Sequence, residues 1–600
     1  MEPTNKIPQR DQIPLEDTWA LEDLFPSDDA WEQEIASVAA MGETLGGYEG
    51  RLSESGDTLL EYLSLMENAN YRVKQLAHYA MRKADEDTRQ SKYQAMKGKF
   101  ISTAIALDTA CSFETPEIMD ISDEVLEGFF AACPGLEKYR RYLVQQRRRR
   151  AHVLGAEQER LLACAGELGQ SPSDIFGAFL NADLKFPDAV DSTGTSRPLS
   201  QSSFITYQES DDRALRKDAF EKLYATLDGF KNTAAAILNA QGKQLNFFAN
   251  ARNYDSMLES SLDANDVPTS VYLNLIDTVH KHLDKMHRYV RMRKKLLGVE
   301  ELHFYDVYAK LVSGVDKKIP FAEAKQTVYE ALAPLGEEYR AILKQGFDNR
   351  WIDVYECEGK RSGAYSAGAD VHPYVLLNYT GTLDSQFTLA HEMGHALHSY
   401  LSNKNQPSIY ADYTIFVAEV ASTCNEALLI DYLLGKTTDK EERAYLLNHF
   451  LEQFKGTLFR QTMFAEFELN IGRKIGAGET LTSQVLCDEY LRLNEQYFGS
   501  DMVMDPQIAV EWARIPHFYF NHYVYQYATG YSAAIALSRR IQTEGERGVQ
   551  DYLRFLSGGC SDSPIELLKG AGVDMSTSEP VEQAMALFNH LLDEMETLMG

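Results

Sequence analysis

The chain has 600 residues, a formal net charge of −30 at pH 7 and 44% hydrophobic residues. Nucleic-acid phosphates repel so acidic a chain, and no apolar run approaches the roughly 20 residues that span a membrane. Because the N-terminus lacks the apolar core of a signal peptide and the seven cysteines are scattered singly, we expect a soluble cytoplasmic protein of two or more lobes, binding neither nucleic acid nor membrane.

The N-terminal third has the pattern of a helical domain. From about 31 to 184, apolar residues recur at spacings of three and four among charged residues, which predicts antiparallel helices. Six arginines between 140 and 150 continue this pattern, and we interpret them as a solvated helix face. A break rich in proline, glycine and hydroxyl residues follows at 186–198. We therefore expect an N-terminal helical domain at 1–185, a linker or small hairpin at 186–205 and a second helical domain at 206–600.

Two regions of the second domain have strand patterns. Residues 303–313 and 350–380 are the convincing candidates, and the second ends at a glycine break before a helical segment. The remainder of this domain has helical periodicity. The fold class that we expect is mainly α, with a small β-sheet beside the helix that begins near 384.

The pentapeptide His391-Glu-Met-Gly-His395 lies on that helical segment. Residues four apart lie on one face of a helix, so His391 and His395 can reach one metal ion. Glu392 is turned about 100° from that face, where a general base for a bound water belongs. Imidazole ligands with an open coordination position describe a catalytic zinc site better than a structural one.

A third ligand is available downstream, in Phe416-Val-Ala-Glu-Val-Ala-Ser-Thr-Cys-Asn-Glu426. Glu419 and Glu426 are seven residues apart and share one helix face, so both can point toward the first helix. We take Glu419 as the third metal ligand. Glu426 either holds a ligating histidine by its other ring nitrogen or is an exposed carboxylate. Cys424 lies off that face, and we assign it to packing.

These motifs resemble the thimet oligopeptidase family of zinc peptidases, and most of all its oligoendopeptidase F branch. The resemblance extends to the segments Leu15–Phe25, Gly359–Ser366, Leu377–Leu383, Arg514–Tyr519 and Tyr523–Tyr531. It implies a nearly all-helical, two-lobed fold of the zincin type. It also implies a deep, narrow channel that admits short peptides.

The last of these segments supplies candidates for stabilising an oxyanion. Tyr523, Tyr527 and Tyr531 recur every four residues, which predicts three phenols along one helical stripe. Such a stripe is common in packing, but beside a metal a phenol or the imidazole of His517 can donate to the oxyanion. The resemblance implies Tyr531 as the foremost donor, Tyr523 and His517 as the next candidates, and Tyr527 in packing. His522 is an alternative to His517, because the interval before Tyr523 is one residue longer than in thimet oligopeptidase.

Taken together, the motifs predict an endopeptidase that cleaves internal bonds of short peptides with one zinc ion. Glu392 takes a proton from the attacking water and later delivers it to the leaving amine. We expect the substrate to extend along an edge strand, for which residues 374–380 are the candidate. Gly363 and Gly368 precede that strand and fit either a loop that approaches the peptide or a plain hairpin turn.

Two alternatives remain open. A zinc carboxypeptidase or other exopeptidase would use the same chemistry, but it needs a charge-matched pocket for a chain end, which no sequence feature identifies. A helical binding protein with a structural zinc site is the other alternative. Glu392 argues against it, because a structural site has no use for that carboxylate.

Overall fold

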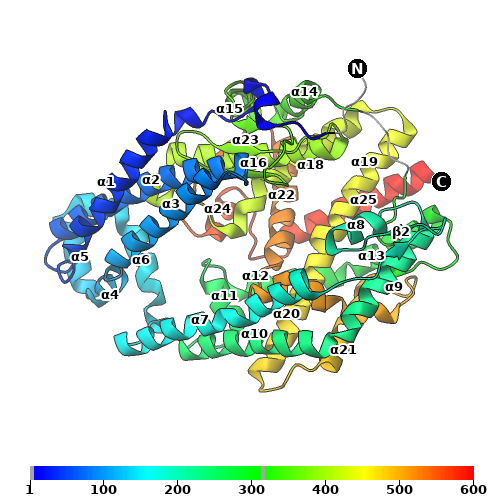
Figure 1. Cartoon of the computed structure of the whole chain (residues 1–600), viewed down its shortest axis with the longest axis horizontal. Helices are drawn as coiled ribbons and strands as arrows, with labels where there is room; N and C mark the ends of the chain where they lie inside the picture. The colour runs from blue at the N-terminus through cyan, green and yellow to red at the C-terminus, as the bar shows by residue number, and fades with distance from the viewer. Residues whose placement is uncertain (1–5, 313–317) are drawn as a thin grey trace. The chain divides into compact units, whose positions relative to one another are not determined.

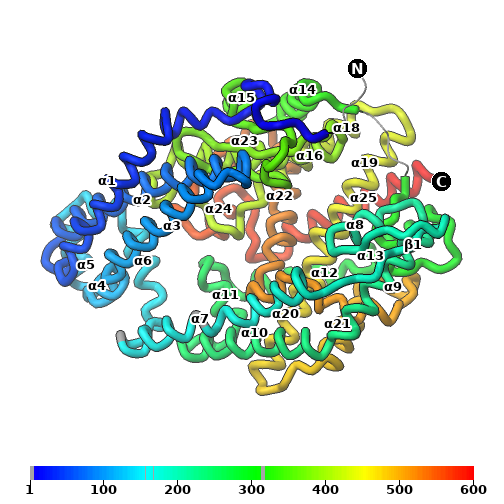
Figure 2. The backbone as a smooth tube through the Cα atoms, viewed as in Figure 1, coloured from blue at the N-terminus to red at the C-terminus, as the bar shows by residue number. Residues whose placement is uncertain are grey.

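The structure is a computed structural model that describes residues 6–312 and 318–600, and it is mainly helical, as predicted (Figure 1). The chain forms two compact units, each assembled from three stretches far apart in the sequence. Figure 2 distinguishes these stretches by colour. Unit 1 comprises Met1–Ala151, Lys317–Leu429 and Leu537–Gly572, and unit 2 comprises His152–Asp316, Ile430–Ala536 and Val573–Gly600. The division at 185 and 206 that the sequence suggested stays a prediction.

Unit 1 is a set of amphipathic helices around an apolar core. Its helices and helical turns are η1 (Arg10–Gln12), η2 (Leu15–Asp17), η3 (Leu21–Asp23), α1 (Asp28–Gly46), α2 (Gly56–Glu86), α3 (Ser91–Ala110), α4 (Glu114–Asp120), α5 (Asp123–Ala132), η4 (Pro134–Tyr139), α6 (Arg140–Arg148), α14 (Phe321–Ala331), η8 (Ala333–Leu335), α15 (Gly336–Asp348), α16 (Leu383–Asn405), α17 (Ser408–Ala411), η9 (Ile415–Val417), α23 (Glu546–Leu556) and α24 (Pro564–Gly570). Ser27 and Ser55 cap α1 and α2 by accepting a backbone N–H three residues ahead. Trp31 and Tyr62 are fully buried in the core, and the Trp31 indole donates to the carbonyl of Leu76 at 3.0 Å.

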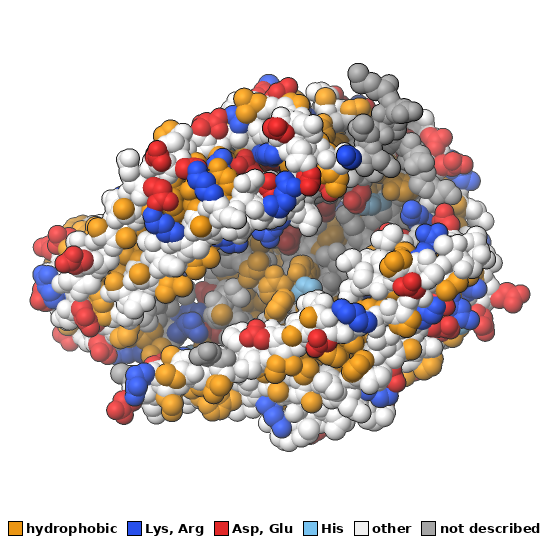
Figure 3. All heavy atoms as spheres, viewed as in Figure 1, with side chains coloured by type: hydrophobic (Ala, Val, Ile, Leu, Met, Phe, Trp, Pro, Cys, Tyr) orange, Lys and Arg blue, Asp and Glu red, His pale blue; other side chains and the backbone are white. Residues whose placement is uncertain are grey.

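The outer surface of α1 and α3 has charges of both signs. Figure 3 shows acidic and basic side chains interspersed over this part of unit 1. Lys92 pairs with Asp28, and Lys99 pairs with Glu32. These exposed pairs join the two helices, although each contributes little to stability.

Unit 2 is likewise helical. Its helices and helical turns are α7 (Ala156–Ala178), η6 (Phe179–Asp183), α8 (Gln201–Gln208), α9 (Arg213–Gly229), α10 (Lys231–Ala251), α11 (Met257–Asp263), α12 (Thr269–Lys281), α13 (Leu283–Leu297), η7 (Phe304–Asp306), α19 (Lys440–Gln453), η10 (Phe454–Phe459), α20 (Arg460–Gly476), α21 (Ser483–Phe498), η11 (Pro506–Arg514), η12 (Pro516–Tyr519) and α25 (Glu579–Met599). Three further elements cross the boundaries between the units: η5 (Arg149–His152), α18 (Ala418–Lys436) and α22 (Tyr525–Glu544).

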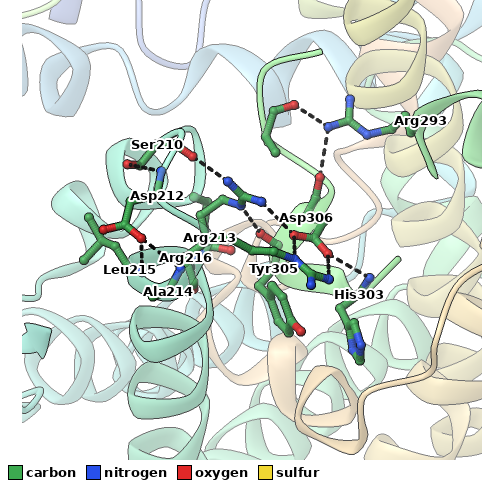
Figure 4. A network of polar contacts seen from close by, with 12 residues as sticks. Ser210, Asp212, Arg213, Ala214, Leu215, Arg216, Arg293, His303, Tyr305 and Asp306 are labelled. Carbon is green, nitrogen blue, oxygen red and sulfur yellow. Dashed lines mark hydrogen bonds and ion pairs between the residues drawn. The ribbon is translucent and has the colours of Figure 1, made fainter. Parts of the chain in front are cut away.

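A buried ionic network holds the segment after α13 in unit 2 (Figure 4). The Asp306 carboxylate is fully buried and accepts hydrogen bonds from Arg213 and Arg216, each at 2.8 Å. It also accepts the backbone N–H of His303, which closes the turn η7. Residues 303–312 are therefore not strands, contrary to the prediction, because this carboxylate folds them into a turn; residue 313 lies outside the described residues.

A three-stranded sheet in unit 1 packs against α16. β3 (Ile352–Asp353) pairs in parallel with β5 (Tyr374–Leu376), and β4 (Tyr365–Ala367) pairs antiparallel with the other side of β5. The predicted small sheet beside the histidine helix is confirmed, but β5 is its central strand. The expectation that 374–380 form an edge is wrong; β4 is the edge strand that contacts α16.

A second pair of strands lies in unit 2. β1 (Ala189–Val190) and β2 (Ser196–Arg197) form a short antiparallel hairpin within the segment 186–205. Among the described residues, no helix combines the length and apolar character that crossing a membrane requires.

Candidate metal centre

Helix α16 presents two imidazoles to one point. It begins after Thr382, whose hydroxyl accepts the N–H of Ser385 at 3.1 Å. Ala390 and Met393 are fully buried, and this fixes the rotation of the helix about its axis. His391 and His395 consequently share its accessible face, with their Nε2 atoms 3.2 Å apart.

Glu419, in the first turn of α18, completes a group of three. Its Oε2 lies 3.3 Å from Nε2 of His391 and 3.4 Å from Nε2 of His395. Of the histidine, cysteine and acidic side chains among the described residues, these two histidines and one glutamate lie close enough together to hold a metal ion. With zinc–ligand distances of about 2.0–2.1 Å, the edge of a tetrahedron is about 3.3–3.4 Å. The three donor atoms therefore fit one tetrahedral ion with one position left over.

The close approach of α16 and α18 depends on Gly394. A β-carbon at this position would lie 2.5 Å from the Cα of Ser422 and 2.7 Å from the carbonyl oxygen of Ala421. Glycine lets the backbone of α18 rest directly on α16, one turn after Glu419. We did not identify this residue from the sequence, although a glycine inside a helical motif was the available signal.

Buried polar contacts fix the two helices behind the metal ligands. The amide of Asn425 on α18 donates to the carbonyl of Ala390 at 3.0 Å and accepts from the Tyr339 hydroxyl at 2.9 Å. Asn425 was also missed, because only the fold brings its partners together. Cys424 is fully buried, and burial raises the pKa of its thiol to about 12. Cys424 therefore belongs to the packing rather than to the metal ligands.

Two further carboxylates adjoin the histidines. Glu426 Oε1 lies 3.2 Å from Nδ1 of His391, where it can hold the ring with Nε2 turned toward the metal position. Burial acts to lower the pKa of His391, but hydrogen bonds with Glu419 and Glu426 raise it well above its ordinary value. Glu392 is 7% exposed, and its Oε2 has no hydrogen-bond partner among the described residues. Burial raises the pKa of Glu392, which suits a group that must exchange a proton.

His517, Tyr523 and Tyr527 form an aromatic group in unit 2. Their rings are partly exposed, with centroids 6.4 Å apart for His517 and Tyr523 and 5.6 Å apart for the two tyrosines. His517 and Tyr527 are 6.0 Å apart. Because α22 begins only at Tyr525, Tyr523 precedes the helix, and the expected single stripe of three tyrosines is wrong for this residue.

The remaining two candidates of this segment are buried inside unit 2. Tyr531 is 2% exposed, and its ring packs edge-on against Phe454 at 5.0 Å. His522 is 3% exposed beside Tyr272, and burial lowers its pKa to about 4. Of the two alternative histidines, His517 accompanies Tyr523, and His522 points into the core.

The glycines before the central strand have different surroundings. Gly363 has a φ of 84°, and a β-carbon added to it would meet no atom within 4 Å, as in an open turn. At Gly368 a β-carbon would lie 2.6 Å from the side chain of Ser399. Gly368 thus brings the end of β4 onto the face of α16 that carries the histidines.

Comparison with known proteins agrees with this geometry. Residues 206–587 match Peptidase family M3, and residues 117–186 match Oligopeptidase F. The chain is 46% identical to Oligopeptidase PepF of Bacillus subtilis, over 99% of this chain and 89% of that protein. It is 39% identical to an Oligoendopeptidase F homolog of Lactococcus lactis, over 98% of both chains. The crystal structure of oligoendopeptidase-F from Enterococcus faecium is similar with a TM-score of 0.75 and 39% identity, over 95% of this chain and 99% of that one. The chain therefore belongs to peptidase family M3, in its oligoendopeptidase F branch.

Proposed function

We propose that this protein is a zinc-dependent endopeptidase that cleaves internal bonds of short peptides in the cytoplasm. The observation that carries the proposal is the His391, His395 and Glu419 triad, whose spacing fits one tetrahedral ion, with the buried Glu392 beside it. Relatives named oligopeptidase or oligoendopeptidase over nearly the whole chain support the substrate class.

The residues around the metal position have distinct tasks. His391, His395 and Glu419 would hold one zinc ion, and Glu426 would keep the His391 ring in its ligating orientation. When bound, zinc supplies Lewis-acid chemistry, which lowers the pKa of water and polarises a carbonyl. Glu392 takes the proton of the attacking water and passes it to the leaving amine. No covalent intermediate with the enzyme is required.

Charge that develops on the carbonyl oxygen needs a hydrogen-bond donor. We assign this task to Tyr523 and His517, because their rings are partly exposed and adjacent. Tyr531, the foremost candidate from the sequence, is buried against Phe454, and we place it after these two.

We further propose that the peptide extends along β4, the edge strand that contacts α16. Among the described residues, β4 has β5 on one side and no strand on the other, and such an edge is where an extended peptide can add a strand. Gly368 keeps this strand close to the helix face of the metal ligands.

The test is cleavage of a quenched fluorescent peptide of about ten residues, capped at both ends, because an endopeptidase tolerates capped ends. Wild type, Glu392→Gln and a chelator-treated sample are compared, with casein as a large substrate. We expect internal cleavage of the peptide but not of casein, lost on chelation and in the variant. The variant should keep its zinc, because Glu392 is not a ligand. Cleavage confined to uncapped peptides would indicate the exopeptidase alternative, and zinc binding without any cleavage would indicate a binding protein.

A further inference from the structure

The turn before α22 in unit 2 has an unusual backbone. Asn521 and His522 are consecutive, neither is glycine, and both have a φ of 55°. Residues other than glycine seldom adopt this left-handed conformation; asparagine and histidine do so more readily than most, but as single residues rather than as a consecutive pair. Strain of this kind concentrates at functional sites.

Three side chains from three helices impose the conformation. Glu468 on α20 accepts the backbone N–H of His522 at 2.9 Å. Ser261 on α11 donates to the carbonyl of Asn521 at 2.5 Å. Gln241 on α10 donates to the carbonyl of Tyr519 at 2.9 Å, just before the turn. Glu468 and Ser261 thus hold the two ends of the peptide group that joins Asn521 and His522, and Gln241 holds the chain two residues earlier.

The turn directs neighbouring residues in opposite directions. His522 is buried beside Tyr272, whereas Tyr523 lies with His517 and Tyr527 in the partly exposed aromatic group. A change in the turn must therefore rotate Tyr523 with respect to His517.

We propose that Glu468 is a positioning residue that sets the orientation of Tyr523 by accepting the backbone N–H of His522. This inference rests on the proposed function, in which Tyr523 contacts the substrate. Glu468 is 4% exposed and forms no ion pair among the described residues. Burial raises its pKa to about 8, while the backbone N–H groups of His522 and Val524 act to lower it. A buried carboxyl group is unfavourable unless it is hydrogen-bonded, and the backbone N–H of His522 supplies that hydrogen bond to Oε1 of Glu468.

The experiment compares Glu468→Leu with Glu468→Gln in the full-length, zinc-loaded enzyme on the capped peptide. Leucine removes the acceptor, whereas the glutamine carbonyl retains it. We expect kcat to fall about 10- to 100-fold in the leucine variant, with KM and zinc content little changed, and to stay within about threefold in the glutamine variant. Glu466 provides a matched control, because it is a buried carboxylate on the same helix that binds His280 and Tyr497 instead. Glu466→Leu should lower the unfolding midpoint without this loss of kcat.

A double-mutant cycle with Tyr523→Phe separates positioning from general destabilisation. If Glu468 acts through Tyr523, the leucine substitution should lower kcat far less in the Tyr523→Phe background. Full additivity, or equal losses in the leucine and glutamine variants, would overturn the inference. If Glu468→Leu does not fold, Ser261→Ala tests the same turn from its other side and should likewise lower kcat only when Tyr523 is present. An unchanged kcat in Tyr523→Phe alone would instead refute the proposed role of Tyr523.

Discussion

Replacing Gly394 with alanine should disrupt the metal centre by pushing α18, which carries the ligand Glu419, away from α16. The added methyl would lie 2.5 Å from Cα and 2.8 Å from N of Ser422, both backbone atoms of α18. Ordinary carbon contacts begin at about 3.5 Å, so α18 must retreat by about 1 Å at this point. Glu419 is one turn away and would move with it, whereas metal ligands tolerate deviations of only about 0.2 Å. We expect zinc affinity to fall at least about 10- to 100-fold, as when a supporting contact is lost.

Two opposing effects set the stability of the metal-free Gly394→Ala protein. Alanine in place of glycine inside a helix favours folding by about 0.5–1 kcal/mol. Overpacking costs about 1–3 kcal/mol, so the net change in the free energy of unfolding should be a loss of up to about 2.5 kcal/mol. Gly98, inside α3, has no atom within 4 Å of a β-carbon position. Gly98→Ala should therefore raise the free energy of unfolding by about 0.5–1 kcal/mol, without an overpacking cost, and leave zinc affinity unchanged.

Competition against a fluorescent chelator measures the zinc affinity, and urea unfolding of metal-free samples measures the stability. The two variants should differ in both. If Gly394→Ala binds zinc as wild type does, contact between α16 and α18 does not set the ligand geometry, and the reasoning is refuted.

Three further outcomes follow from named contacts. Glu426→Ala should weaken zinc binding about 10- to 100-fold, because His391 loses the partner 3.2 Å from its Nδ1; unchanged affinity in the chelator assay would contradict this. In the metal-free protein the pKa of His391 lies well above its ordinary value, so zinc binding at pH 7 should release about one proton, and affinity should fall about tenfold per pH unit below pH 7. Titration calorimetry in buffers of different ionisation enthalpy measures that proton, and its absence would refute the assignment. Asp306→Ala should lower the free energy of unfolding by about 3–5 kcal/mol, because it leaves Arg216 buried without its partner. Urea unfolding tests this, and Arg213→Ala, at a residue whose side chain is 43% exposed, should cost less.

The sequence was sufficient where the relevant geometry is local. The four-residue spacing of His391 and His395 fixes their shared face through helix periodicity alone. Glu419 could be selected by type and periodicity, but its distance from the histidines depends on Gly394, whose importance arises only when α18 packs on α16. Strand order was not predictable for a similar reason. β5 became central because β3, more than 20 residues earlier, pairs with its free side, and such pairing is set by the fold rather than by composition.

The tyrosines show how a local rule fails when the backbone departs from the element that the rule assumes. A spacing of four predicts one stripe only if all members lie on the helix, and the left-handed turn at 521–522 leaves Tyr523 outside it. Tyr531 remains on the helix but packs on Phe454. We therefore expect Tyr523→Phe to lower kcat about 100- to 1,000-fold while stability is kept, as for loss of an oxyanion donor. Tyr531→Phe should change kcat much less, because the ring that fills the core is retained. Steady-state kinetics on the capped peptide, with unfolding midpoints for both variants, compares them. The reverse order of effects would return the donor to Tyr531 and require α22 to rotate or shift when peptide binds.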